Sequence, residues 1–225
     1  MSVPDGHSAT ALNPQLASAG LQPLSDAILA KFDTYLRLLV KWNARINLTA
    51  VRDPQDILSR HFVESIACAQ HLPQGIGSLL DFGSGAGFPG IPVALCRPDI
   101  AVTLAESQNK KASFLREVVR SLGLSTTVFA HRAEDLKTQF DCVTLRAVDQ
   151  MSAALISAAK LVRRPGCLAV MTTNEELGAI QSRLGTEFKF SEPILLPGSH
   201  QRVLALAFKG NQRPLMFHVE HSCQL

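Results

Sequence analysis

The sequence predicts an α/β fold in which a mostly parallel sheet carries helices on both faces. From residue 78 onward, short apolar segments alternate with segments of helical periodicity, which is typical of parallel sheets. A turn crowded with glycines, among them Gly83, Gly85 and Gly87, follows the first apolar segment, as in Rossmann-like nucleotide-binding units. The chain has 225 residues, of which 46% are hydrophobic, and is long enough to bury one substantial core.

An N-terminal helical extension is expected before the sheet. Residues 1–20 are rich in Ala, Ser, Pro and Gly, and we expect them to form a disordered tail. Residues 21–76 are expected to form a helical cap. Its first helix starts near Ser25, a plausible N-cap, and its second helix starts at Asp53, which is followed by Pro54 at the first helical position.

Seven strands are expected in the core, which should span residues 77–210 and leave residues 211–225 as a tail. A Pro-Gly-Ser-His turn at 197–200 separates the last two strands, so the sheet should end in an antiparallel hairpin. The expected strands are 78–82, 101–105, 126–130, 141–145, 166–172, 190–196 and 202–208. The expected helices between them are 90–96, 108–122, 150–162 and 174–184.

Charge and cysteine content restrict the compartment and the partners. A formal net charge of +3 permits a nucleic-acid partner without indicating one. The cysteines form no C-x-x-C pair, which favours a reducing compartment. No secretory signal and no apolar run of membrane-spanning length is visible, so we expect a cytoplasmic protein without a membrane partner. His218 and His221 have no third ligand beside them, and no metal is expected.

Two functional interpretations of the glycine turn are open, beside a purely structural one. Gly85, Gly87 and Gly90 fit the G-x-G-x-x-G pattern of dinucleotide-binding proteins. Gly83, Gly85 and Gly87, led by Asp81, fit the D-x-G-x-G-x-G loop of S-adenosylmethionine (SAM)-dependent methyltransferases. An acid ahead of the loop suits the cationic amino-acid end of SAM. A terminal hairpin is also common in these enzymes, so the sequence favours SAM over a nicotinamide or flavin.

Charged residues at two strand ends complete the candidate site. Glu106 ends the second strand about 20 residues after the loop, where an acid accepts both ribose hydroxyls of a nucleoside cofactor. Arg146 ends the fourth strand; we interpret it as a site residue, with a structural ion pair as the alternative.

Basic side chains elsewhere are candidates for RNA phosphates, or alternatively belong to solvated helix faces. The candidates are Arg52, Arg60, His61, Lys110 and Lys111. The two lysines stand at the start of a helix, where the helix dipole disfavours cations, so a role toward phosphate is plausible for them.

A series of motifs between about residues 24 and 209 resembles one bacterial enzyme family. The motifs are Trp42-Asn43, Asn47 to Pro54, Arg60 to Ser65, Asp81 to Pro92, Glu106-Ser107, Lys110-Lys111, Phe114-Leu115, Arg132 to Glu134 and Arg146-Ala147. Their order resembles that of the 16S ribosomal RNA guanine-N7 methyltransferases, formerly called glucose-inhibited division protein B. The resemblance implies a class I SAM-dependent methyltransferase fold and transfer to N7 of one guanine near the decoding site.

The resemblance also implies cofactor contacts and a partner. The implied SAM contacts are Gly83, Phe88, Ala133, Glu134 and Arg146. The implied partner is 16S rRNA in the small ribosomal subunit, and we expect a monomeric enzyme. Guanine N7 has a free lone pair, so no general base is required. Arg146 could instead bind guanine O6 while N7 reacts. A nicotinamide-dependent oxidoreductase and a SAM-binding protein that transfers no methyl group are the competing functions.

Overall fold

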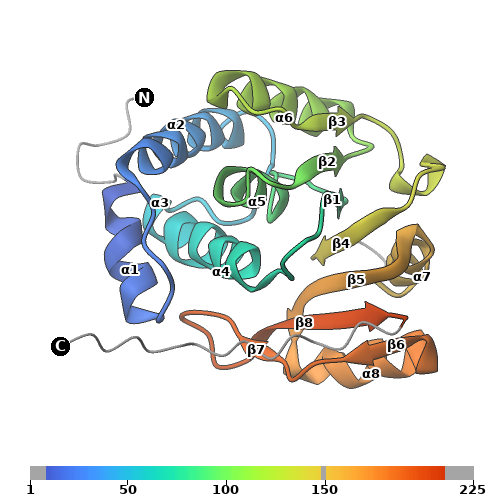
Figure 1. The fold of residues 1–225 in the computed structure, drawn as a ribbon. Helices are drawn as coiled ribbons and strands as arrows, with labels where there is room; N and C mark the ends of the chain where they lie inside the picture. The colour runs from blue at the N-terminus through green and yellow to red at the C-terminus, as the bar shows by residue number, and fades with distance from the viewer. Residues whose placement is uncertain (1–8, 148–150, 211–225) are drawn as a thin grey trace.

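The computed structural model describes residues 9–147 and 151–210, and the sheet at its centre has eight strands. The strand order is β3-β2-β1-β4-β5-β8-β6, with β7 paired to β8 (Figure 1). The first five strands are parallel to one another, and β8 is antiparallel to β5, β6 and β7. The strands are β1 Ser78–Phe82, β2 Ala101–Ala105, β3 Thr127–Phe129, β4 Phe140–Arg146, β5 Val162–Thr173, β6 Phe188–Phe190, β7 Ile194–Leu195 and β8 Arg202–Lys209.

The expected count of seven strands is wrong. The segment predicted as one strand, 190–196, forms the end of β6 and the whole of β7, separated by three residues outside the ladder. Pro193 lies in this break, and proline has no N–H to donate to a neighbouring strand. The antiparallel end of the sheet is confirmed.

Two apolar clusters, one on each face of the sheet, hold the helices in place. Alternate residues of each strand point to opposite faces, so Leu79 and Cys142 belong to one cluster, and Leu80 and Val143 to the other. Helices α1 to α6 pack on the first face, and α7 and α8 on the second (Figure 1). The helices are α1 Leu12–Ser18, α2 Asp26–Asn43, α3 Pro54–Ile57, α4 Glu64–His71, α5 Gly90–Cys96, α6 Asn109–Leu122, α7 Met151–Leu161 and α8 Asn174–Leu184.

Part of the segment expected to be a disordered tail is helical. A 3-10 turn, η1 (Ala9–Ala11), runs into α1, and Leu12 and Leu16 are fully buried in the larger apolar cluster. The amide of Asn13 donates to the carbonyl of Leu24 and accepts from its N–H, which ties α1 to the following segment. Leu12 and Leu16 are four residues apart and lie on one face of the helix, a pattern too short to stand out in a segment rich in Ala and Ser. The tail expected at 211–225 lies outside the described residues.

The second predicted helix is continuous but not uniform. Between α3 and α4 lies a π-helical segment, η2 (Leu58–Val63), which contains Arg60 and His61. Asp53 caps the start of α3 as expected, because its carboxylate accepts the N–H of Gln55. π-Helical turns are rare in proteins, and the ones that do occur are often found at functional sites.

In the described parts of the chain, no helix is both long and apolar enough to cross a membrane.

Candidate active site

The glycine loop joins β1 to α5 and bends as the sequence predicts. Gly83, Gly85 and Gly87 have φ angles of 70°, 55° and 94°, which residues with a side chain rarely adopt. A Cβ built on Gly85 would approach only the carbonyl oxygen of Gly83, at 3.9 Å, whereas one on Gly87 would lie 2.7 Å from Ile91 Cγ1. The backbone at Gly85 is therefore free for a ligand to approach closely, and Gly87 packs against the protein.

Asp81 is buried at the end of β1 and accepts hydrogen bonds from β4 and from the residues after the loop. Its side chain is buried, with Oδ1 accepting from the Thr144 hydroxyl at 2.8 Å and Oδ2 from the Gly90 N–H at 3.2 Å. Burial raises the pKa of Asp81 to about 6, and the hydrogen bonds from Thr144, Ser84 and Gly90 oppose that rise. Both carboxylate oxygens thus join β1 to β4 and to the first turn of α5.

Glu106 follows β2 directly and reaches back to the loop. Its Oε2 accepts the Gly85 N–H at 2.9 Å, and its Oε1 accepts the Gln108 N–H at 2.7 Å. Each oxygen of an ionised carboxylate has about two acceptor sites, so both oxygens retain a free one. Glu106 is therefore already oriented beside the loop and can accept two further hydroxyl hydrogens.

Tyr35 connects the N-terminal helices to the loop. Its buried hydroxyl donates to the Ala86 carbonyl at 2.5 Å, and its ring stacks on Phe62 with centroids 5.1 Å apart. Phe88, from the loop, completes this aromatic cluster at 5.4 Å from the Tyr35 ring. Sequence reasoning missed Tyr35. The signal was present, because a tyrosine on the apolar stripe of a helix needs a buried partner for its hydroxyl.

Arg146, at the end of β4, is held by the π-helical turn. Its Nη2, which carries two N–H groups, lies 2.9 Å from Glu64 Oε2, 2.7 Å from the Arg60 carbonyl oxygen and 3.0 Å from His61 Nδ1. The guanidinium carbon lies over the Phe88 ring, 5.8 Å from the centroid. The ion pair that was the alternative interpretation is thus present, and the guanidinium also lies beside Phe88 of the loop.

Glu64 carries a second arginine. Its side chain is 1% exposed, and its Oε1 accepts from Arg202, the first residue of β8, at 2.6 Å. One buried carboxylate therefore holds two guanidinium groups from strands distant in sequence. Sequence reasoning missed both Glu64 and Arg202.

His61 is held between Arg146 and Thr49. Its Nδ1 lies 3.0 Å from Arg146 Nη2, and its Nε2 lies 2.9 Å from Thr49 Oγ1. Burial, followed by the positive charges of Arg146 and Arg60, lowers the pKa of His61 to about 3. The ring stacks on Phe88 with centroids 4.9 Å apart. His61 thus extends the wall of the site without acting as an acid near neutral pH.

Replacement of His61 by glutamine should make the free energy of unfolding less dependent on pH below about pH 6.5. Below about pH 6.5 the unfolded chain protonates this imidazole while the folded chain does not, so His61 contributes stability that is lost as the pH falls toward 3. We expect the free energy of unfolding of the parent chain to fall faster than that of His61→Gln, by about 1 kcal/mol per pH unit. Urea unfolding at pH 6.5, 5.5 and 4.5 measures both slopes, and equal slopes would contradict the assignment.

Comparison with known proteins places the chain in a family. A family model described as GidB: rRNA small subunit methyltransferase G matches residues 28–191. The chain belongs to this family. The ribosomal RNA small subunit methyltransferase G of Xanthomonas euvesicatoria pv. vesicatoria (strain 85-10) is 39% identical over 212 residues, covering 89% of this chain and 98% of that protein. The protein of the same description in Stenotrophomonas maltophilia (strain K279a) is 40% identical over 197 residues, covering 84% and 89%.

The GidB family match confirms the resemblance drawn from the motifs. It includes the glycine loop, Glu106, the π-helical turn and Arg146, and it ends before Arg202.

Solved structures of other proteins confirm the predicted fold. A SAM-dependent methyltransferase from Aquifex aeolicus aligns with a TM-score of 0.56 at 15% identity, covering 72% of this chain and 97% of that chain. P. horikoshii TYW2 in complex with MeSAdo aligns with a TM-score of 0.55 at 11% identity, covering 66% and 62%. At these identities the likeness concerns the fold alone.

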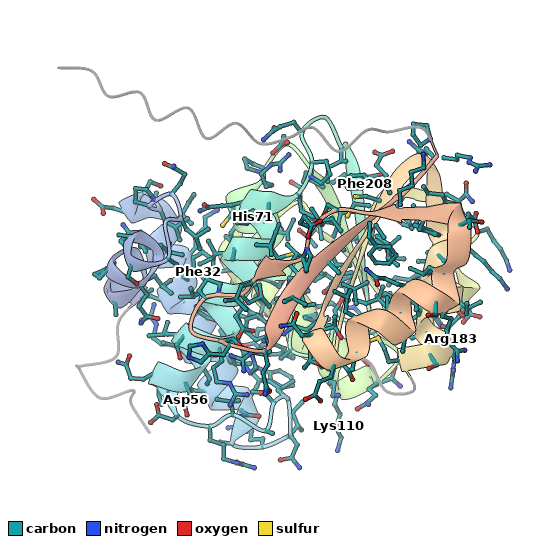
Figure 2. All side chains as sticks on the ribbon, turned by 90° about the horizontal axis from the view of Figure 1, so that it is seen from below. Phe32, Asp56, His71, Lys110, Arg183 and Phe208 are labelled. Atoms are coloured by element: carbon teal, nitrogen blue, oxygen red, sulfur yellow. The ribbon has the colours of Figure 1, made fainter. Side chains whose placement is uncertain are left out.

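Other expected residues make no hydrogen bond with the glycine loop in the described part of the chain. Ala133 is buried and Glu134 is exposed in η3 (Ala133–Asp135), after β3. Arg52 is exposed and donates to Asn47 Oδ1 at 3.1 Å. Lys110 projects outward from the start of α6 (Figure 2), and Lys111 beside it is half-buried. The structure thus brings Asp81, Glu106, Phe88, His61 and Arg146 together at the loop.

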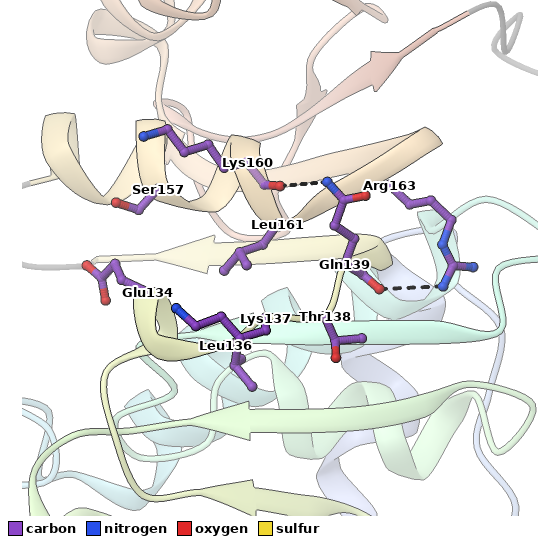
Figure 3. A pocket seen from close by; sticks show the side chains of 9 residues that line it. All are labelled: Glu134, Leu136, Lys137, Thr138, Gln139, Ser157, Lys160, Leu161 and Arg163. Atoms are coloured by element: carbon purple, nitrogen blue, oxygen red, sulfur yellow. Dashed lines mark hydrogen bonds between the residues drawn. The ribbon is translucent and has the colours of Figure 1, made fainter.

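A cavity of about 720 Å³ lies elsewhere, between η3 and the end of α7 (Figure 3). Of the expected site residues, its lining includes only Glu134. The carbonyl of Lys160 closes one side by accepting from Gln139 at 3.0 Å. The lining residues are Glu134, Leu136, Lys137, Thr138, Gln139, Ser157, Lys160, Leu161 and Arg163. Because none of them comes from the glycine loop, this cavity is not the candidate active site.

Proposed function

We propose that this chain transfers the methyl group of SAM to N7 of one guanine in the 16S rRNA of the small ribosomal subunit. The observation that carries the proposal is the GidB family match across the loop and both charged strand ends. We further propose that it acts as a monomer in the cytoplasm, on the stem-loop near the decoding site.

The loop residues fit the proposed cofactor. The open space above Gly85, with Gly83 and Gly87 in left-handed conformations, allows a nucleoside to lie directly on the backbone. We propose that Glu106 accepts the ribose hydroxyls on its free acceptor sites, and that Asp81 acts from below by holding the loop. In this proposal Phe88 borders the cofactor, and Ala133 and Glu134 contact it from η3.

The chemistry requires alignment rather than proton transfer. SAM supplies a methyl group on a sulfonium, and guanine N7 attacks with its own lone pair. The residues therefore need to orient the base and exclude water. Arg146 suits this task because Glu64 and the Arg60 carbonyl fix its guanidinium, and a fixed guanidinium can donate to guanine O6. His61, uncharged and stacked on Phe88, extends the apolar wall of the site.

RNA phosphates would meet the surrounding cations. Arg52, Arg60, Lys110 and Lys111 are the proposed contacts, and three of them are exposed. Their charges favour RNA without reading its sequence.

The test is methyl transfer from labelled SAM to small subunits, and to free 16S rRNA, from cells that lack the enzyme. We expect label at one guanine, which reduction and aniline cleavage would map because N7-methylguanine permits strand scission. Label on another base or atom would overturn the acceptor. Tight binding of S-adenosylhomocysteine without label on either RNA would overturn the proposed reaction.

Replacement of Glu106 by alanine should weaken cofactor binding. It removes the acceptor for two ribose hydroxyls and also frees the Gly85 N–H. We expect the affinity for S-adenosylhomocysteine to fall about ten- to a hundredfold, since hydrogen bonds to a charged acceptor are the strong ones. Calorimetry measures the affinity, and Glu175→Ala, at an exposed position on α8, is the control. Unchanged affinity in a folded Glu106→Ala chain would contradict the ribose assignment.

A further inference from the structure

Three arginines lie at or beside the π-helical turn, and Glu64 forms ion pairs with two of them. Glu64 is paired with Arg146 and Arg202, and Arg60 is close enough for its charge to act on the same His61 ring. Within the described residues, no ion pair engages Arg60, whose side chain is exposed. His61 is uncharged, and the carboxylates that act on the arginines are Glu64 and, through Arg146, Asp81, so the three arginines retain a net positive charge. Such a cluster attracts an anion.

Arg202 lies on the substrate side of this cluster. It pairs across the sheet with Thr173, the last residue of β5, and therefore stands at the carboxyl edge where Arg146 also ends its strand. Ligands of open α/β sheets bind along this edge. The order β2-β1-β4-β5-β8 puts Glu106 and Arg202 at opposite ends, four strand spacings or roughly 19 Å apart. The cofactor end of the site is thus remote from Arg202.

The Arg202 guanidinium can bind a ligand without leaving Glu64. Its Nε and Nη2 both donate to Glu64 Oε1, at 2.7 and 2.6 Å, while 32% of the side chain is exposed. Guanidinium groups carry five N–H donors, so others remain for an oxygen of a phosphate. Glu64 therefore positions the group and leaves part of it open.

We infer that Arg202, positioned by Glu64 and assisted by Arg60, binds a backbone phosphate of the RNA next to the target nucleotide. The inference rests on the proposed function, because it requires RNA as the substrate. It adds a contact from β8, beyond the part of the chain that the family model covers. A phosphate there would hold the strand while Arg146 faces the base.

The salt dependence of RNA binding tests the inference. We expect Arg202→Gln to weaken binding to unmethylated small subunits roughly tenfold and to reduce the slope of log affinity against log salt by about 1, as loss of one phosphate contact does. Affinity for S-adenosylhomocysteine should stay within about twofold. Arg202→Lys keeps the charge and should keep the slope. Arg183→Gln on α8 is the matched control and should change nothing. In Figure 2, Arg183 lies on the opposite side of the molecule from Asp56, which precedes the π-helical turn.

An unchanged salt slope in Arg202→Gln overturns the inference. So does a loss of S-adenosylhomocysteine affinity with normal RNA binding, which would assign Arg202 to the carboxylate of the cofactor. Modification of the parent chain with phenylglyoxal gives a second test that needs no folded variant. RNA should protect Arg202 while S-adenosylhomocysteine does not, and equal labelling with and without RNA would contradict the contact. If the parent chain neither binds nor methylates the subunit, the proposed function itself fails.

Discussion

Replacement of Gly90 by alanine is expected to destabilise the chain by about 3 kcal/mol and to abolish cofactor binding. A Cβ on Gly90 would lie 2.3 Å from Leu104 Cδ2 and 2.6 Å from Asp81 Oδ2, and neither atom is at the end of a flexible exposed side chain. The first turn of α5 would have to move away from the sheet, which would break the hydrogen bond from Gly90 to Asp81. The loop above that bond would lose its fixed shape.

Gly178→Ala is the matched control for this substitution. Gly178 is solvent-exposed and lies in the middle of α8, where an added Cβ would meet nothing within 4 Å. Alanine is preferred over glycine in a helix by about 0.5–1 kcal/mol, so this variant should gain stability. Urea unfolding and calorimetry with S-adenosylhomocysteine measure both variants. A Gly90→Ala chain with parental stability and affinity would show that the contact with Asp81 does not shape the loop.

Replacement of Glu64 by alanine is the second change with a large expected effect. It leaves Arg146 and Arg202 side by side without their shared carboxylate, in a place where Glu64 is 1% exposed. Removal of one partner from a buried ion pair costs about 3–5 kcal/mol, because the remaining charge is uncompensated. We expect a loss of this size in the free energy of unfolding, together with loss of methyl transfer as Arg146 is no longer fixed.

Two further variants separate charge from packing. Glu192→Ala removes an exposed carboxylate between β6 and β7 and should change stability by less than about 0.5 kcal/mol. Arg202→Gln in the Glu64→Ala chain removes one of the two facing cations and should recover part of the lost stability. The opposite result, a further loss in the double variant, would show that the repulsion of the two arginines is not the cause.

The elements that were predicted correctly are encoded by patterns of residues close together in the sequence. Strands β1, β2 and β4 are short apolar runs bounded by turn residues, and their positions agree with the expectation within two residues. The glycine loop and Glu106 were predictable because they depend on spacing along one βαβ unit. The predictions failed at segments whose sequence pattern is weak: α1 has only two buried leucines, and β7 has only two residues.

The missed residues of the candidate site depend on contacts between distant parts of the chain. Glu64 and Arg202 are 138 positions apart, and Tyr35 and Ala86 are 51 apart. A glutamate among apolar helix residues and an arginine at the start of a strand have many ordinary explanations. Only the packing of the π-helical turn against the carboxyl edge of the sheet shows that they meet.

The hydrogen bond between Tyr35 and Ala86 matters for protein engineering. Because Tyr35 belongs to a helix outside the βαβ unit of the glycine loop, the loop is not expected to keep its conformation when that unit is transferred alone. Grafting residues 77–210 onto another scaffold would leave the Ala86 carbonyl without its donor and the face beneath the N-terminal helices bare to water. Whoever transplants the site must therefore carry the helical extension with it.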